Sequence, residues 1–284
     1  MLNYIKMDLY RMFRMKSFLV IGFVLIMGTF FTTSMSVLDY NAMKEETEKN
    51  IQSYEQEMQS DEEPVNLGMD VTLPTRPGQM VTVYDQIYAN LHGKFIALFM
   101  VIFAVLFSAS DLSSGYIKNI GGQMKNRGSL ILSKAAALFV YTVLTMLFYL
   151  IVQTAAQAIC FRNLEMGPLK GLMIYLSVQA LLHYALLLIC MAVTVITRNK
   201  VFSMAFAVLV CMNVMIILYS TIDKVIEKLG IENFNLIRYT VTGRMSLLSM
   251  SPSAEGCERA VLTAVLFGLA VTALSSRIFR KRDI

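Results

Sequence analysis

Long apolar runs without a charged side chain constrain this chain more than any other feature. They lie at residues 17–38, 95–110, 135–159, 171–197, 201–221 and 260–276. About 20 apolar residues suffice to cross the hydrocarbon of a bilayer, because a helix rises about 1.5 Å per residue. Backbone groups in lipid must be satisfied within the segment, so such runs are expected to be helical. The sequence therefore predicts an all-α polytopic membrane protein with six transmembrane helices.

Composition agrees with this prediction. Only 16% of the residues are charged, against roughly a quarter in soluble domains, and 56% are apolar. A chain of 284 residues has room for one membrane domain, 1–284, and for no separate soluble enzyme domain. The net charge of +5 could suggest a nucleic-acid partner, but the basic residues are unevenly distributed. We attribute the charge to membrane topology and expect no nucleic acid to bind.

The distribution of basic residues predicts which ends of the helices face the cytoplasm, because Lys and Arg near membrane spans are enriched on that side. Four segments, 1–16, 111–134, 198–200 and 277–284, contain 14 Lys and Arg against 3 Asp and Glu. The remaining segments outside the spans contain 11 Lys and Arg against 17 Asp and Glu. We therefore expect a multi-pass protein of the plasma (cell) membrane with cytoplasmic N- and C-termini.

Three segments outside the spans have their own patterns. Residues 1–16 place apolar side chains at helical spacing among basic ones, which predicts an amphipathic interfacial helix; a frayed basic terminus is the alternative. Residues 39–94 form a large extracellular loop that is acidic from Glu45 to Glu63. Residues 222–259 begin with an i, i+3, i+4, i+7 apolar stripe, which predicts an extracellular amphipathic segment before the last span.

The run at 95–110 is short for a membrane span. It reaches span length if it continues outward through Leu91, and we then expect Lys94 to extend its ammonium group to the membrane interface. Residues 198–200 leave only a tight hinge between the fourth and fifth spans, which predicts an antiparallel hairpin.

Motifs for catalysis, nucleotide binding and metal binding are missing from the sequence. It has no P-loop pattern and no G-x-S-x-G nucleophile elbow, and its only histidines, His92 and His183, exclude an H-E-x-x-H site. The four cysteines show no C-x-x-C spacing; Cys160 and Cys257 both fall on the predicted outer side, so a disulfide between them stays open. We expect no enzyme activity, no cofactor and no metal site in this chain.

Five polar side chains inside the predicted spans are candidates for a substrate path. Polar groups within lipid are costly unless they face water or bond to a partner. Four of the five form two i, i+4 pairs, so the members of each pair share a helix face. Interhelical hydrogen bonding, worth about 0.6–2 kcal/mol per contact, is the alternative role. The candidates are Gln153, Gln157, Gln179, His183 and Asn213.

The loop at 111–134 carries the most informative pattern. An acidic residue at the end of the second span is followed by a glycine that permits a turn, a short amphipathic segment and a basic stretch that re-enters the membrane. Such a compact element is suited to dock against another protein. The residues of the pattern are Asp111, Gly115, Tyr116, Ile117, Lys118, Asn119, Arg127, Ser133 and Lys134.

In these residues the chain resembles the permease subunits of ABC-2-type ATP-binding-cassette transporters. Their loop after the second span reads acidic-x-x-x-Gly, then Thr or Tyr, Ile or Phe, Lys and Asn, and later Ser-Lys before the third span. The usual Glu of that family is Asp111 here, and Gly121-Gly122 replaces apolar residues. The arrangement of one amphipathic helix, six spans and amphipathic outer helices before the last span is also similar.

The resemblance implies a permease that exports or extracts a peptide-like or amphipathic substrate, energised by a separate ATPase that binds the ATP. It implies coupling to that ATPase through the loop 111–134 and secondarily through residues 1–16. It also implies a second permease copy in a homo- or heterodimer, and contact with membrane lipid. The large outer loop resembles that of permeases for antimicrobial-peptide export or immunity. The alternative is a non-transporting immunity or sensor protein that binds a peptide through the loop 39–94.

Overall fold

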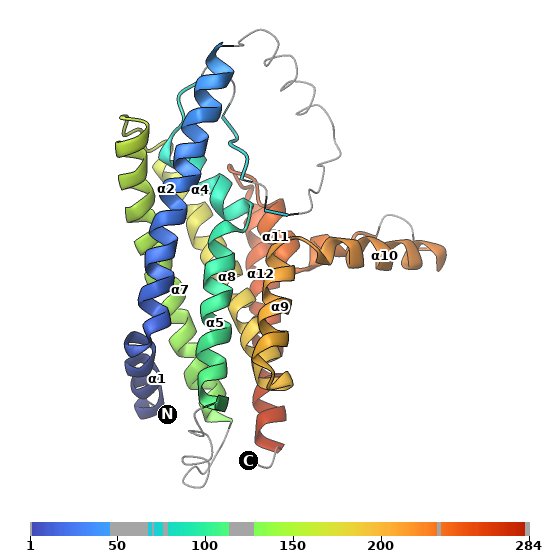
Figure 1. The fold of residues 1–284 in the computed structure, drawn as a ribbon. Helices are drawn as coiled ribbons and strands as arrows, with labels where there is room; N and C mark the ends of the chain where they lie inside the picture. The colour runs from blue at the N-terminus through green and yellow to red at the C-terminus, as the bar shows by residue number, and fades with distance from the viewer. Residues whose placement is uncertain are drawn as a thin grey trace.

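The apolar runs of the sequence form long α-helices in the computed structural model. It describes residues 2–45, 68–69, 71–75, 79–113, 128–231 and 234–281. Within these ranges the elements are all helical and no strand is present. The long helices run side by side, with α1 (Leu2–Arg14) and the last turns of α12 (Ala254–Lys281) at the same end (Figure 1). We call this end the terminal face.

Four helices are long and apolar enough to cross a membrane without a break. The best window of each has a mean hydropathy between 1.8 and 2.3. Each contains one of the predicted runs and is longer than it, because residues next to the apolar run continue the same helix. The four are α2 (Lys16–Glu45), α7 (Ser129–Cys160), α8 (Leu169–Thr197) and α12.

Two further apolar segments are bent helix pairs. The first pair, α4 (Val83–His92) and α5 (Phe95–Ser113), is bent by 52°. The second pair, α9 (Lys200–Cys211) and α10 (Met215–Lys228), is bent by 73°, and α10 projects sideways from the bundle (Figure 1). The described chain thus has four uninterrupted candidate spans, or up to six if each bent pair is one span, and the all-α polytopic fold is confirmed.

The backbone at the two bends explains why the span predicted at 201–221 is not one continuous helix. Lys94 and Asn213 have φ angles of 61° and 59°, in the left-handed region that a right-handed helix cannot continue through. Residues from Met215 onward therefore belong to α10, which also contains the start of the amphipathic stretch expected at 222. Asn adopts left-handed backbone angles more readily than most residues, so Asn213 is the one local signal in the run 201–221 that predicts a helix break.

The side chain of Lys94 contradicts the expectation that it reaches the membrane interface. It is 2% exposed, and its ammonium group donates a hydrogen bond to Oδ1 of Asn213. The two helix breaks therefore face each other inside the bundle. Nδ2 of Asn213 donates to the carbonyl of Gly68 at 3.0 Å, and the Gly68 N–H donates to the carbonyl of Met212 at 3.0 Å. A short stretch of the segment 39–94, which is predicted to be an outer loop, is thus bonded to the second break.

The outer loop predicted at 39–94 contains helix at both ends. At its start α2 continues to Glu45, and at its end α4 is held by a capping box. In that box the N–H of Thr82 donates to the carboxylate of Asp85 at 2.7 Å, and the N–H of Asp85 donates to the Thr82 hydroxyl at 3.2 Å. The acidic stretch from Glu45 to Glu63 lies, beyond its first residue, outside the described residues.

The segment predicted at 222–259 as amphipathic consists of the second half of α10, the 3-10 helix η1 (Leu236–Tyr239) and α11 (Val241–Leu247) before α12 begins. The carboxylate of Asp223 accepts a hydrogen bond from the N–H of Leu236 at 2.9 Å, which holds η1 against α10. Gly243 of α11 has no room for a side chain, because a Cβ there would lie 1.9 Å from a backbone oxygen of η1.

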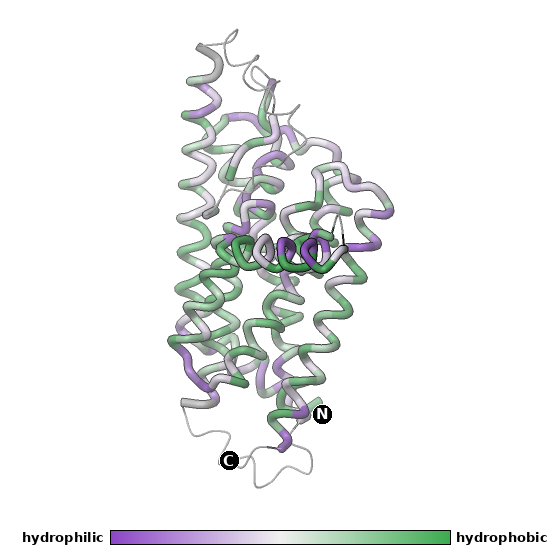
Figure 2. Tube along the Cα trace, turned by 90° about the vertical axis from the view of Figure 1, so that its right-hand side faces the viewer, coloured by the Kyte–Doolittle hydropathy of each residue, from purple (hydrophilic) through white to green (hydrophobic). Residues whose placement is uncertain are grey.

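The buried apolar side chains of α4, α5, α7 and α8 belong to one continuous core. In contrast, α2 and α12 expose large apolar side chains along their lengths, among them Leu19 and Phe23 on α2 and Leu266 and Leu269 on α12. Figure 2 shows that apolar residues run along most of the length of the bundle. Exposed apolar surface of this extent is expected to face lipid or another protein.

The disulfide left open between Cys160 and Cys257 is not formed in the structure. Both residues are free, partly buried thiols. Sγ of Cys160 lies 3.7 Å from the hydroxyl of Ser34 on α2, while Cys257 packs against the apolar core. The two cysteines therefore contact different neighbours.

Candidate functional site

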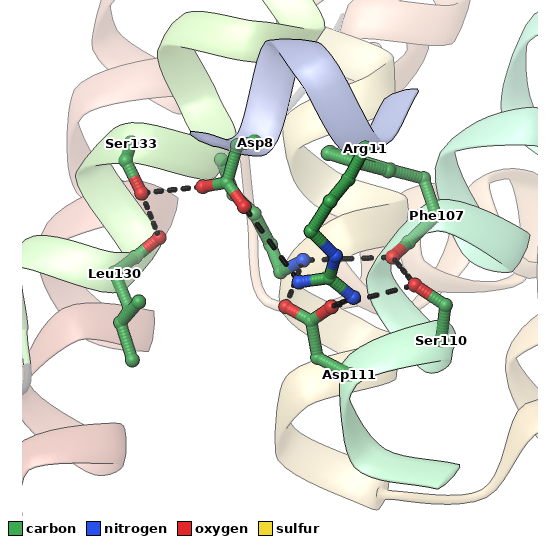
Figure 3. Close-up of polar contacts among 8 residues, drawn as sticks. Asp8, Arg11, Phe107, Ser110, Asp111, Leu130 and Ser133 are labelled. Carbon is green, nitrogen blue, oxygen red and sulfur yellow. Dashed lines mark hydrogen bonds and ion pairs between the residues drawn. The ribbon is translucent and has the colours of Figure 1, made fainter. Parts of the chain in front are cut away.

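Charged side chains from three helices are buried together at the terminal face (Figure 3). They come from α1, from the end of α5 and from the second turn of α7. Their burial is unusual, since Asp and Lys are almost never fully buried unless they are paired. We call this set the charged cluster, and it consists of Asp8, Arg11, Asp111, Ser133 and Lys134.

Asp111 stands at the centre of the charged cluster. Its Oδ1 lies 2.5 Å from Nη2 of Arg11, and its Oδ2 pairs with the ammonium group of Lys134. The same ammonium group lies 4.4 Å above the ring of Phe107 and 3.5 Å from the carbonyl oxygen of that residue. Because Asp111 and Lys134 are the first and last residues of the loop 111–134, their ion pair joins the two ends of the loop.

Asp8 fastens α1 to α7. The hydroxyl of Ser133 donates to Oδ2 of Asp8 at 2.5 Å, and Oδ1 of Asp8 lies 4.0 Å from Nη1 of Arg11 (Figure 3). Burial raises the pKa of the Asp8 carboxyl; Lys134, the Ser133 hydrogen bond and Arg11 favour the ionised form and offset only part of that effect. The carboxylate is therefore held in place at some cost in free energy.

Helical spacing brings these groups together. Arg11 and Met12 follow Asp8 by three and four residues, so both share with it the side of α1 that faces the bundle, and Met12 is fully buried there. Two acidic and two basic side chains make the cluster neutral in total. Neutrality matters because a buried charge is tolerated only when a partner and hydrogen bonds offset its loss of hydration.

The structure places only part of the predicted coupling loop. Asp111 and Lys134 are located and in contact, and Ser133 belongs to the same cluster. The other residues of the pattern lie outside the described residues: Gly115, Tyr116, Ile117, Lys118, Asn119 and Arg127. Their role in coupling stays a prediction.

The first pair of candidate path residues is buried and joins helices. Nε2 of Gln153 donates to the hydroxyl of Thr33 on α2 at 3.0 Å, and its Oε1 accepts from Asn90 on α4 at 3.2 Å. Nε2 of Gln157 donates to the carbonyl of Val81 at 2.7 Å. These contacts link α7 to α2, to α4 and to the residues just before α4.

The second pair lies on α8. Nε2 of Gln179 donates to the carbonyl of Met245 in α11 at 3.1 Å, and Nδ1 of His183 lies 2.7 Å from the carbonyl of Gln179. Nε2 of His183 has no hydrogen-bond partner among the described residues. Asn213 stands at the α9–α10 break, away from both pairs along the chain. The three glutamines and Asn213 bond to other elements of the fold, whereas the hydrogen bond of His183 lies within α8. The part of all five residues in a substrate path stays a prediction.

Sequence reasoning did not assign Asp8 and Arg11 to the site. The available signal was Asp8 itself, the one acidic residue in 1–16, placed one turn before the apolar Met12. An acid on the apolar side of a basic helix predicts a buried cationic partner, but nothing in the sequence says which partner. The ion pair between Arg11 and Asp111 joins residues 100 positions apart, and no local sequence pattern predicts such a pairing.

The fold and the charged cluster define an all-α polytopic membrane protein whose N-terminal helix is tied by buried ion pairs to the ends of two bundle helices. A family model described as "Protein of unknown function (DUF2705)" matches residues 58–284, and the chain belongs to this family. The matched region contains Asp111 and Lys134 and begins after α1. No curated protein matches the chain.

Proposed function

We propose that the chain is the permease subunit of an ATP-driven ABC transporter, in which a separate ATPase supplies the energy to export or extract a peptide-like or amphipathic substrate. The charged cluster carries this proposal. It closes the loop 111–134 at its base and connects that base to α1. A partner that displaces the loop therefore moves α1, α5 and α7 together.

Buried ion pairs suit this transmission because they resist separation. Removing the Asp111 carboxylate would leave Lys134 as an unpaired buried charge, which costs about 3–5 kcal/mol. Apolar contacts in the bundle are non-directional and allow sliding, whereas a carboxylate between two cations fixes both distance and direction. A force on the loop then reaches the helices before the cluster opens.

In this proposal the terminal face is the cytoplasmic side of the plasma membrane. The excess of 14 basic over 3 acidic residues in the segments at that side supports this orientation. α1 supports it as well: its Leu2 and Phe13 are 66% and 48% exposed although both are apolar, as expected for a helix in the headgroup layer. The exposed apolar sides of α2 and α12 provide surface for a second permease copy.

Affinity purification of the tagged full-length chain from its native membrane tests the proposal. We expect a P-loop ATPase in the detergent-solubilised complex, identified by mass spectrometry. Asp111→Ala should leave membrane insertion intact and uncouple ATP hydrolysis from transport, because the base of the loop is no longer joined to α1. Lys6→Gln is the matched control, since Lys6 is an exposed basic residue of the same helix outside the cluster.

A native complex that contains no ATPase would refute the proposal, and so would an Asp111→Ala variant that transports as well as the Lys6→Gln control. The immunity or sensor alternative predicts a different result. In that case, deletion within the loop 39–94 would abolish protection against a peptide, while disruption of the ATPase would have no effect.

A further inference from the structure

A pocket of about 380 Å³ opens between η1, α11 and α12, at the end of α12 remote from the terminal face. One part of its wall is cationic and the other is apolar. The cationic part is contributed by three different elements, and the apolar part by α12. The lining residues that matter here are Arg238, Arg244, Arg259, Leu262, Leu266 and Phe267.

The three arginines leave the pocket with an excess of positive charge. Arg259 pairs with Glu255 one turn earlier on α12, and both side chains are more than half exposed. No carboxylate is among the lining residues, and Arg238 and Arg244 form no ion pair within the described chain. Guanidinium groups gathered in this way repel one another unless an anion lies between them.

Arg244 is a second reason to expect that the pocket binds an anion. Its side chain is half-buried, and its Nε has no hydrogen-bond partner among the described residues. Burial, followed by the charge of Arg259, lowers the pKa of Arg244 from its usual value. A buried guanidinium donor without an acceptor is costly, and an anion in the pocket would remove that cost.

The apolar wall restricts which anion fits. Leu262 and Leu266 follow Arg259 at intervals of three and four residues, so they lie below it on one side of α12. Both are 57% exposed, and residues 260–276 contain no charged side chain. Arg259 thus stands where the helix leaves the apolar layer, the level at which lipid phosphates are found. A soluble anion would use the arginines and leave this wall uncovered.

We propose that this pocket binds the phosphate of an anionic phospholipid, with an acyl chain lying along Leu262, Leu266 and Phe267 of α12. Arginine is suited to the headgroup because its planar donors match phosphate oxygens in pairs. The site is independent of the charged cluster, which belongs to the opposite end of the bundle. The proposal therefore does not rest on the transporter function.

Native mass spectrometry of the purified full-length chain in detergent tests the proposal. Phosphatidylglycerol and phosphatidylcholine of equal chain length are added at equal concentration. We expect one phosphatidylglycerol to be retained in preference to phosphatidylcholine. Arg244→Gln and Arg238→Gln should each weaken that binding about tenfold, the loss of one charge-assisted hydrogen bond. Since Arg238 is exposed, its replacement keeps the test valid if Arg244→Gln disturbs folding.

Lys170→Gln is the matched control, because it removes one exposed positive charge from the first turn of α8 at the same end of the bundle. It should bind phosphatidylglycerol as the wild type does. Leu266→Asn tests the apolar wall and should weaken binding of the long-chain lipid. Equal retention of the two lipids, or unchanged binding by both arginine variants, would overturn the proposal. Displacement of the lipid by an equimolar amount of inorganic phosphate would assign the pocket to a free anion instead.

Discussion

Replacing Asp111 by Asn is the sharpest test of the charged cluster. The substitution keeps the shape of the side chain and removes the negative charge between Arg11 and Lys134. Arg11 is 24% exposed and can regain water, but Lys134 is only 5% exposed in its side chain and cannot. The carbonyl and ring of Phe107 stay near its ammonium group and offset part of the loss. We therefore expect a loss of about 3 kcal/mol, at the lower end of the range for breaking a buried pair.

A double-mutant cycle separates the pair from its surroundings. Lys134→Met alone leaves Asp111 with Arg11 and should cost less than Asp111→Asn. The double variant Asp111→Asn/Lys134→Met contains no unpaired buried charge, so it should be more stable than Asp111→Asn alone. The coupling between the two positions should fall between about 0.5 and 3 kcal/mol.

The measurement is reversible unfolding of the purified chain in mixed detergent micelles. The chain contains no Trp, so far-ultraviolet circular dichroism is the suitable signal. The control is Lys6→Gln, which should change the free energy of unfolding by less than about 0.5 kcal/mol. An Asp111→Asn variant within about 1 kcal/mol of the wild type, or a double variant less stable than Asp111→Asn, would show that Lys134 is not held by this carboxylate in a dry site.

Three other predictions follow from the same packing. Relative to Asp8→Asn, the wild type should gain stability as the pH falls from neutrality toward about 4, because the raised pKa lets the folded carboxyl take up its proton first. Unfolding at a series of pH values measures this gain, and a constant difference would contradict it. Gly243→Ala should destabilise by about 1–3 kcal/mol through overpacking against η1, whereas Gly22→Ala, where nothing lies within 4 Å of the new Cβ, should be neutral or stabilising in thermal unfolding. Asn213→Leu should be more destabilising than Lys94→Met in detergent unfolding, since only the former leaves a buried cation without this acceptor; the reverse order would show that the ammonium group is solvated.

The uninterrupted spans were predictable because their signal is local. α8 is the clearest case: the run predicted at 171–197 ends at the residue where the helix ends and starts two residues after it. Arg198 then takes a left-handed conformation with φ of 53°, and Asn199 caps α9 through its side chain. The apolar run, the residue that ends the helix and the residue that caps the next one are neighbours in sequence. The bounds of α8 could therefore be predicted without tertiary information.

The broken spans could not be predicted in the same way. Asn213 interrupts a run in which every other residue from 201 to 217 is compatible with a membrane helix. Its left-handed backbone is stabilised by partners far away in sequence, Lys94 and the backbone of Gly68. Likewise Asp111 was marked by its pattern, but its pairing with Arg11 depends on how α1 packs on the bundle. Residues whose conformation is set by distant contacts are beyond local reasoning.

Lys94 and Lys134 are both buried, and the charge of each is compensated by a different kind of partner. The kind of partner follows from the position of each lysine in the bundle. Lys134 stands at the terminal face, where Asp111 at the end of α5 and Arg11 of α1 reach it without crossing the apolar layer. Lys94 lies between two helix breaks, where a carboxylate would add a second charge to a dry site. Its acceptor is a neutral amide two residues beyond the last residue of α9, at the helix end that carries partial negative charge from unpaired carbonyl groups. Breaking the helix therefore creates the partial charge that makes a buried cation tolerable, and the cation in turn donates to the side chain of the residue at the second break. The two breaks are in this sense one structural feature, because an unbroken α9–α10 helix would not place the Asn213 acceptor and the helix end next to Lys94.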